Sequence, residues 1–249
     1  MGLTDLFRGI KFYFTANHVI LKYKLWPYLI IPGIMSVCYL FLMIIFGIIY
    51  LSGFAASINE TFIPGFLMGG ITEIILSIFL WIFLLIIIYI SYKEVVLIFF
   101  APILCYLSER VEYLISNKKP PRFNFNDFFI DIFRGLTLSL KNLASMIILT
   151  FIAWLVIFVP IIGPFASPIL ILFIQSFYGG VGLIDYTLER KRYSVKESMI
   201  FARSNRGMIT GVGAGFILIL IIPIFGWFAA PGYGTVAATL AILEKINKN

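Results

Sequence analysis

The sequence predicts an all-α integral membrane protein with two long transmembrane helices, two partly inserted helical hairpins and amphipathic helices on the cytoplasmic side. Three observations predict this fold class. Hydrophobic residues make up 61% of the 249 residues and charged residues only 12%, whereas soluble domains carry about 25% charged residues. Long runs contain no charged residue, and two of these runs are broken at the centre by nearly the same segment. We expect one membrane domain over residues 1–249, because this length leaves no room for a second soluble domain of ordinary size.

The first expected element is an interfacial amphipathic helix within residues 1–20. Its apolar residues recur at helical spacing on one face: Leu3, Phe7, Ile10 and Phe14. The charged residues of the segment lie off this face, as they do in helices that rest on a membrane surface. The segment lacks the uninterrupted apolar core and the cleavage site of a signal peptide, so we do not expect one.

The two long spans follow. The first is expected at 25–52, inside a charge-free run whose two prolines lie near its start, where a helix tolerates them best. A bilayer crossing needs about 20 apolar residues, and this run exceeds that length. The second span is expected as one long helix over 70–116 that projects beyond the bilayer, because apolar residues resume after Lys93 and Glu94.

Two repeated segments interrupt the remaining apolar runs. Residues 159–168 read VPIIGPFASP and residues 222–231 read IPIFGWFAAP, with six of ten positions identical. They divide the run 142–184 and the run 207–243 into pairs of helical arms. We expect each pair to form a hairpin that turns at the repeated prolines and glycines, which are Pro160, Gly163, Pro223, Gly226 and Pro231.

The depth of these hairpins follows from the lengths of their arms. The arms of the run 207–243 cover 207–222 and 232–243, which are too short for two crossings at about 1.5 Å per residue. This favours a re-entrant hairpin that enters and leaves on the same face. The run 142–184 is long enough for two full spans or for a half-inserted hairpin, and its likeness to the other run favours the half-inserted form.

Two further helices are expected on the cytoplasmic side. The segment 126–141 opens with Asn126 and acidic residues and ends with a basic one, as the helix dipole prefers. The segment 195–206 follows a capping box formed by Ser194 and Glu197.

The basic residues give the orientation in the membrane. None of the 19 lysines and arginines lies in the loop 50–73 between the two long spans. The positive-inside rule therefore places the opposite side, with both termini, in the cytoplasm. This orientation is the same for half-inserted and fully spanning hairpins.

The sequence offers little for catalysis or metal binding. It contains two cysteines, Cys38 and Cys105, both in apolar runs, and the single histidine His18. It contains no P-loop, no GxGxxG and no HExxH motif. We therefore expect no enzymatic activity, no catalytic residues, no metal, no cofactor and no nucleic-acid partner.

The broken segments allow two interpretations. Unpaired backbone groups in hydrocarbon cost several kcal/mol each, so broken helices at membrane depth occur only against protein or water. Helix N-termini there, expected near 165–167 and 230–233, could attract an anion, and paired broken segments point to a substrate path. The same segments could also simply form tight turns for packing.

Five segments carry a family resemblance. They are LWPYLIIP at 25–32, APILCYLSERVEYL at 101–114, FVPIIGP at 158–164, GLIDYTLERKRYSVKES at 182–198, and the block from FARSNRG to GTVAATL at 201–240. With the order of the apolar runs, they resemble the CysZ-type sulfate permease family, a branch of the etoposide-induced-protein superfamily. The resemblance implies two spanning helices, two partly inserted hairpins, a homo-oligomer, and sulfate uptake across the cytoplasmic (inner) membrane without ATP hydrolysis, which feeds cysteine synthesis.

The resemblance also implies an anion site, at a Gly-Leu-Arg stretch just before the proline of the first span. This chain has Lys24, Leu25 and Trp26 there, and Trp donates one N–H where Arg offers a charged fork. Lys22 and Lys24 could supply the positive charge, although lysines beside membranes also fix topology or bind lipid headgroups. In LSERVE the resemblance implies a pore or polar core formed by Glu109, Arg110 and Glu112, and an ion pair between helices that shapes the oligomer is an equal alternative.

The sequence thus predicts a homo-oligomeric permease for sulfate or a similar small anion, in contact with membrane lipid. The alternative is a non-transporting protein of the same superfamily that organises the membrane through its amphipathic helices. A membrane enzyme would need paired catalytic groups, which the sequence does not show.

Overall fold

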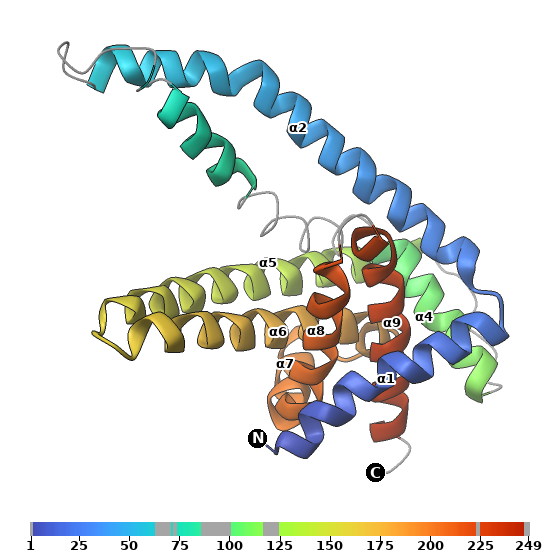
Figure 1. Cartoon of the computed structure of the whole chain (residues 1–249). Helices are drawn as coiled ribbons and strands as arrows, with labels where there is room; N and C mark the ends of the chain where they lie inside the picture. Colours follow the sequence, from blue (N-terminus) through green and yellow to red (C-terminus); the bar gives the residue numbers. More distant parts are fainter. Residues whose placement is uncertain are drawn as a thin grey trace. The chain divides into compact units, whose positions relative to one another are not determined.

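The structure is a computed structural model that describes residues 2–62, 71, 74–85, 101–116, 125–222 and 225–246. All regular elements in these ranges are helices, which confirms the all-α prediction (Figure 1). They are α1 (Leu3–Lys22), α2 (Trp26–Phe62), the helix Ile74–Leu85, α4 (Ala101–Ser116), α5 (Phe125–Leu155), a 3-10 turn (Val156–Phe158), α6 (Gly163–Arg190), α7 (Val195–Ser204), α8 (Arg206–Leu220) and α9 (Phe225–Ile246).

Three helical stretches are long and apolar enough to cross a membrane. They are Val37–Ile58, Phe133–Phe158 and Gly163–Arg190, with 22, 26 and 28 residues. The chain is therefore a helical membrane protein, as its composition predicts. The first stretch overlaps the predicted first span 25–52 and ends six residues beyond it, at Ile58. Of the predicted long helix 70–116, the parts 74–85 and 101–116 are helical, and residues 86–100 lie outside the described ranges.

The chain forms two compact units. One contains residues 34–95, which are most of α2 and the helix Ile74–Leu85. Within it, the two helices approach closely at Gly47, where a Cβ would lie 2.6 Å from Cδ2 of Leu84. The other unit contains residues 1–33 and 96–249, and it holds all the polar clusters described below.

Helix α8 forms the centre of the larger unit, between α1 and α6. Its glycines allow both neighbours to approach its backbone. A Cβ at Gly211 would lie 2.0 Å from the carbonyl oxygen of Leu6 in α1, and a Cβ at Gly213 would lie 1.7 Å from the carbonyl oxygen of Ser176 in α6. Small residues serve the same purpose at helix contacts in membranes.

Helix α1 packs one face on α8 and exposes another. Tyr13 is buried and donates a hydrogen bond to the carbonyl oxygen of Val212, at 2.7 Å, and burial raises its pKa well above the usual value. The predicted apolar stripe lies on a different face, where Leu3, Phe7 and Phe14 are exposed. Helix α1 covers the segment 1–20 in which the sequence analysis places an amphipathic helix, and it extends to Lys22.

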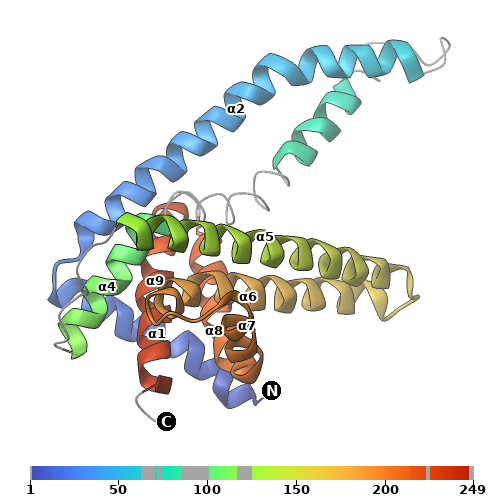
Figure 2. The same ribbon diagram turned by 180° about the vertical axis from the view of Figure 1, so that it is seen from behind.

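The first hairpin is formed by α5 and α6, which lie side by side in both ribbon views (Figures 1 and 2). Pro160 lies in its turn and Gly163 begins α6. Helix α5 starts at Phe125, so the predicted cytoplasmic helix 126–141 and the first arm form one helix. Residues 136–155 contain no proline or glycine, so no helix-breaking residue separates the two predicted helices.

The second hairpin is formed by α8 and α9, with Gly226 next to the turn. Pro223 lies outside the described residues. The prediction for Pro231 was wrong, because this residue lies inside α9, which starts at Phe225 and not near residue 232. Inside a helix, proline loses one backbone hydrogen bond and its ring crowds the preceding turn. Membrane helices tolerate this because neighbouring groups satisfy the freed carbonyl.

The loop between the hairpins ends in the predicted capping box. The side chain of Ser194 accepts a hydrogen bond from the backbone of Glu197, and the carboxylate of Glu197 accepts one from the backbone of Ser194. These bonds lower the pKa of Glu197 below its usual value. Helix α7 therefore begins where the sequence predicts.

Candidate functional site

The predicted anion stretch lies at the corner between α1 and α2. The corner is a Schellman turn: the backbone N–H of Lys24 donates to Leu21 at 3.4 Å, and that of Leu25 donates to Ile20 at 3.0 Å. Lys24 has a φ of 53°, in the left-handed region where glycine is normally found. Leu25 is only 2% exposed and anchors the corner in the core. A glycine, which the resemblance implies at this point, would adopt this φ without strain.

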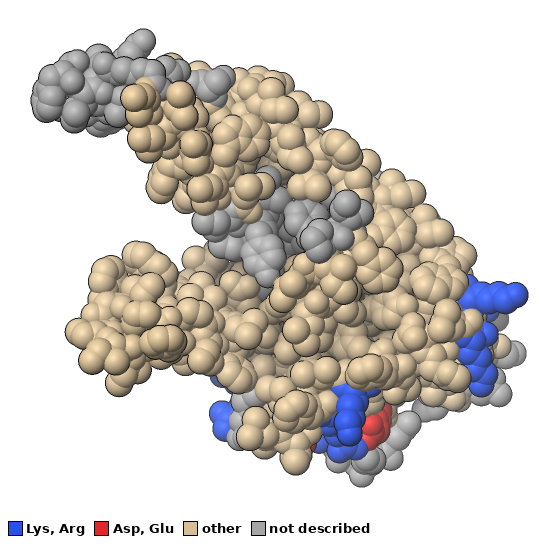
Figure 3. Space-filling view, viewed as in Figure 1, with Lys and Arg blue, Asp and Glu red and all other residues tan. Residues whose placement is uncertain are grey.

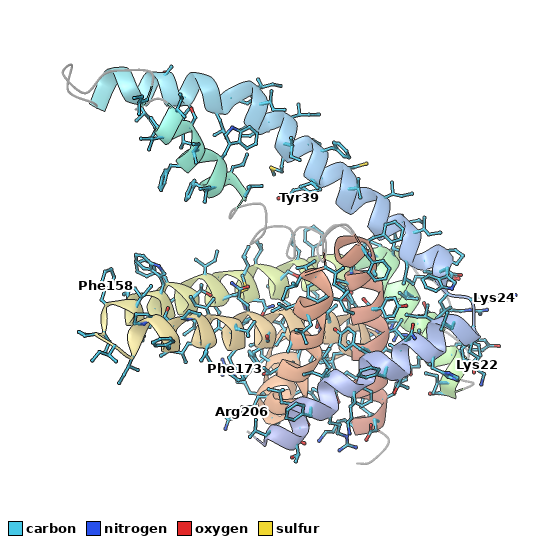
Figure 4. The ribbon with its side chains drawn as sticks, viewed as in Figure 1. Lys22, Lys24, Tyr39, Phe158, Phe173 and Arg206 are labelled. Atoms are coloured by element: carbon cyan, nitrogen blue, oxygen red, sulfur yellow. The ribbon has the colours of Figure 1, made fainter. Side chains whose placement is uncertain are left out.

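The corner presents positive charge to the surroundings. Lys22 and Lys24 are exposed, and Figure 4 shows both at the same end of α1. Basic side chains protrude in the same region of the surface in Figure 3. Lys22 Nζ lies 5.2 Å from the ring centroid of Tyr23, and within the described ranges Lys24 has no side-chain partner. Trp26 opens α2 and is 41% exposed.

Helix α4 reaches this corner through an aromatic contact. The ring centroids of Tyr28 in α2 and Tyr106 in α4 are 5.5 Å apart. Of the predicted polar residues on α4, Glu109 is half-buried and Arg110 is exposed with its guanidinium over the ring of Tyr113. Only Glu112 is buried, so the structure brings one of the three into a polar core.

Glu112 is the acidic end of a network that joins α4, α6 and α9. Its carboxylate pairs with Lys191 and with Arg190, whose Nη2 lies 3.1 Å from Oε2. Arg190 also donates to Ser108 at 2.8 Å. The hydroxyl of Ser108 lies 3.0 Å from that of Thr187 and 2.8 Å from that of Thr239.

Five members of this network were not singled out from the sequence as site residues: Ser108, Thr187, Arg190, Lys191 and Thr239. A signal was present, because Ser108 and Glu112 are four residues apart on one helix face, as are Thr187 and Lys191. Polar residues at this spacing in apolar helices indicate a shared buried face. Which faces meet depends on the packing of three helices that are distant in sequence.

A second buried cluster joins α5, α6 and α7. Arg134 makes two hydrogen bonds to the carboxylate of Asp185, at 3.0 and 3.2 Å, and a third to Ser198 at 2.8 Å. Its Nε donates to the carbonyl oxygen of Tyr193 at 2.6 Å. Arg134 is thus committed to a carboxylate, as Arg190 is, so neither is free to attract an anion from outside.

The site is therefore suited to electrostatic binding. The corner offers lysine charges and the exposed side chain of Trp26. No group of three His, Cys, Asp or Glu residues in the described ranges could hold a metal ion. These features define a helical membrane protein with an exposed cationic corner beside the first span.

The family model described as "Sulfate transporter CysZ/Etoposide-induced protein 2.4" matches residues 12–231, and the chain belongs to this family, which confirms the resemblance.

The curated relatives are named transporters. Proteins named "Sulfate transporter CysZ" from Pseudomonas aeruginosa strains LESB58 and PAO1 are each 27% identical to this chain over 148 residues. The relative of the same name from Pseudomonas paraeruginosa strain PA7 matches equally. Each match covers 59% of this chain and 60% of the relative, so the chain spans well under two thirds of their length.

Proposed function

We propose that this protein is a permease for sulfate or a similar oxyanion, which it moves across the inner membrane without ATP hydrolysis to supply sulfur assimilation. The observation that carries this proposal is the exposed Lys24, which has no partner in the described ranges. It lies in the stretch where the family pattern implies an anion site. Family membership and the names of the relatives support the choice of sulfate.

The proposed mechanism is electrostatic. Lys22 and Lys24 attract the anion, and the first turn of α2 and the N–H of Trp26 replace part of its hydration. Lysine acts as a point charge and not as a bidentate fork, so binding at this corner is weak. Weak contacts at several places favour conduction, because a bound anion must also leave.

The proposed topology places both termini in the cytoplasm. The distribution of basic residues supports this orientation. An ion pair between Arg8 in α1 and Glu244 in α9 also supports it, because it holds the two ends of the chain on one side. We further propose a homo-oligomer, on the strength of the family resemblance, with Glu109, Arg110 and Glu112 near its polar interior.

Sulfate flux into liposomes that contain only this protein tests the proposal. We expect uptake above protein-free liposomes, reduced in Lys22→Gln/Lys24→Gln. The charge-matched control is Lys11→Gln/Lys141→Gln, in which both lysines are exposed and distant from the corner in the sequence. Equal loss in both variants would remove the corner as the anion site.

A second candidate function is a non-transporting membrane organiser. The observation that favours it is the exposed apolar stripe of α1, where Leu3, Phe7 and Phe14 suit insertion into a membrane surface. Absence of sulfate flux in the unmodified, folded protein would favour this function over transport.

A further inference from the structure

A polar groove of about 340 Å³ lies at the other end of α1 from the Lys22–Trp26 corner. One basic residue from each of three helices lines it: Arg203 at the end of α7, Arg206 at the start of α8 and Lys245 near the end of α9. Figure 4 shows Arg206 close to the first turn of α1, which contributes Gly2 and Asp5. The 20 residues of α1 separate the groove from the corner by about 30 Å.

The three basic side chains of the groove have no carboxylate partner among the described residues. In the described part of the chain, none of them has an ion pair or a side-chain hydrogen bond, and Asp5 is the one acidic residue in the lining. Other basic residues of the same unit do have carboxylate partners, such as Arg8 with Glu244. Converging like charges repel one another unless an anion joins them. Three basic residues against one acidic residue give the groove the net positive charge that an anion site requires.

The backbone adds donors to these charges. Asn205, the residue before α8, does not cap the helix with its side chain, and its amide donates to the carbonyl oxygen of Phe201 at 3.1 Å instead. The first N–H groups of α8 thus have no capping side chain, and the residues of this first turn, Arg206, Gly207 and Met208, line the groove. Two guanidinium groups, an ammonium group and backbone N–H groups suit a phosphate group, which accepts several charge-assisted hydrogen bonds at once.

The surroundings of the groove indicate the source of the phosphate. The exposed stripe of α1 begins at Leu3, directly after Gly2 in the groove lining, and continues through Phe7 and Phe14. Their exposed fractions are 72%, 58% and 77%. An anionic lipid is complementary to both features of this surface: its phosphate to the basic groove, and its acyl chains to the apolar stripe. We propose that the groove binds the headgroup phosphate of an anionic lipid, with its acyl chains along α1.

The test measures thermal unfolding of the full chain in neutral detergent with added short-chain lipids. Dioctanoyl phosphatidylglycerol should raise the unfolding temperature, and dioctanoyl phosphatidylcholine should raise it much less. The variant Arg203→Gln/Arg206→Gln/Lys245→Gln should bind phosphatidylglycerol at least about tenfold more weakly, since each basic residue near a membrane surface adds attraction to anionic lipid. The matched control is Lys11→Gln/Lys141→Gln/Lys196→Gln, which removes three exposed lysines outside the groove and should bind as the unmodified protein does.

Two further arms separate the sources of the anion. Sodium phosphate and sodium sulfate are added in place of lipid, and Leu3→Ser/Phe7→Ser removes apolar surface without touching the groove charges. The proposal expects little effect of the free anions and weaker lipid binding in the apolar variant. Equal stabilisation by free anion and lipid would show a free-anion site and overturn the lipid assignment. Equal loss in the groove variant and its control would overturn the site itself.

The unmodified protein provides a check if the triple variant does not fold. Stabilisation by phosphatidylglycerol should then fall with added sodium chloride, because salt screens contacts between exposed charges. It should also be reduced in the single variant Arg206→Gln. Salt-independent binding would overturn the proposal. None of these measurements depends on sulfate transport, so the proposal stands or fails separately from the permease function.

Discussion

Gly163 and Gly226 occupy equivalent positions in their two hairpins. A Cβ at Gly163 would lie 2.3 Å from the carbonyl oxygen of Val156, and a Cβ at Gly226 would lie 2.0 Å from that of Ile219, in both cases seven residues earlier. The N–H of each glycine donates to the carbonyl oxygen four residues earlier, at 2.8 Å in both turns. The repeated sequence therefore gives both glycines the same backbone contacts, and each allows a close approach of two backbone segments.

Alanine at either glycine should destabilise the protein. We expect Gly163→Ala and Gly226→Ala each to lower the free energy of unfolding by about 1–3 kcal/mol, because a backbone carbonyl must shift to admit the methyl group. The measurement is chemical or thermal unfolding in detergent. Gly53→Ala in α2 is the control, since a Cβ there meets nothing within 4 Å and helix propensity favours alanine by about 0.5–1 kcal/mol. Equal effects at all three positions would contradict this account of the turns.

Removal of Glu112 should disrupt the network of α4, α6 and α9. Arg190 and Lys191 would lose their carboxylate, and breaking a buried pair by removing one partner costs about 3–5 kcal/mol. The side chains here retain slight exposure, so we expect Glu112→Ala to fall at the lower end of this range in an unfolding experiment. Glu109→Ala, one turn away and half-buried, should change stability by less than about 0.5 kcal/mol. A tolerated Glu112→Ala would show that the network contributes little to stability.

The sequence predicted the helices better than their contacts. The positions of α1, α2, α7 and α8 follow from local signals: charge-free runs, helical periodicity and a capping box. Helix α9 was predicted to begin too late, because Pro231 looks like a breaker when its neighbours are unknown. In the structure, the turn between α8 and α9 is complete before this proline.

The predicted site shows the same limit. Lys22, Lys24 and Trp26 adjoin one another in sequence, so their common location at a corner was predictable. Glu112 was recognised from a local motif, but its partner Arg190 lies 78 residues further on. Their pairing depends on how α4 packs against α6, which periodicity alone does not specify. The groove at Arg206 was missed for the same reason, since its three basic residues come from three helices.

Restoring the family glycine at the corner should stabilise the fold. Lys24 has a φ of 53°, and a non-glycine residue in this region costs about 1 kcal/mol. Lys24→Gly should therefore raise the unfolding temperature, whereas Lys24→Ala should not, because alanine keeps the strain. Both variants lose the same charge, so both should bind sulfate more weakly. A higher unfolding temperature in Lys24→Gly alone would then separate the backbone role of this position from its role in anion binding. Equal unfolding temperatures would contradict the backbone role.

Restoring the family arginine tests the anion site directly. Trp26 is exposed at the start of α2, so arginine should fit there without disturbing the core. We expect Trp26→Arg to strengthen sulfate binding severalfold, because a guanidinium forms two parallel charge-assisted bonds to an oxyanion. Calorimetric titration of the purified protein with sulfate measures this change, with Trp26→Gln as the uncharged control. Sulfate binding that is the same in both variants would place the anion elsewhere.

The depth of the first hairpin remains the sharpest test of the predicted topology. Its two apolar stretches have 26 and 28 residues, so each is long enough to cross the bilayer, while the half-inserted form is favoured by its likeness to the α8–α9 hairpin. The visible end of this hairpin shows no charged side chain in Figure 3, and its tip residue Ile161 is 85% exposed. In a variant without Cys38 and Cys105, we expect Ile161→Cys to resist a membrane-impermeant thiol reagent added outside the cell. Ser57→Cys, near the expected periplasmic end of α2, should react and serves as the positive control.

If the half-inserted form is correct, the tip stays within hydrocarbon, where a charged reagent cannot follow. Labelling of position 161 as fast as position 57 would instead mean that α5 and α6 both cross the membrane, and the repeated turn would then lie in the periplasm.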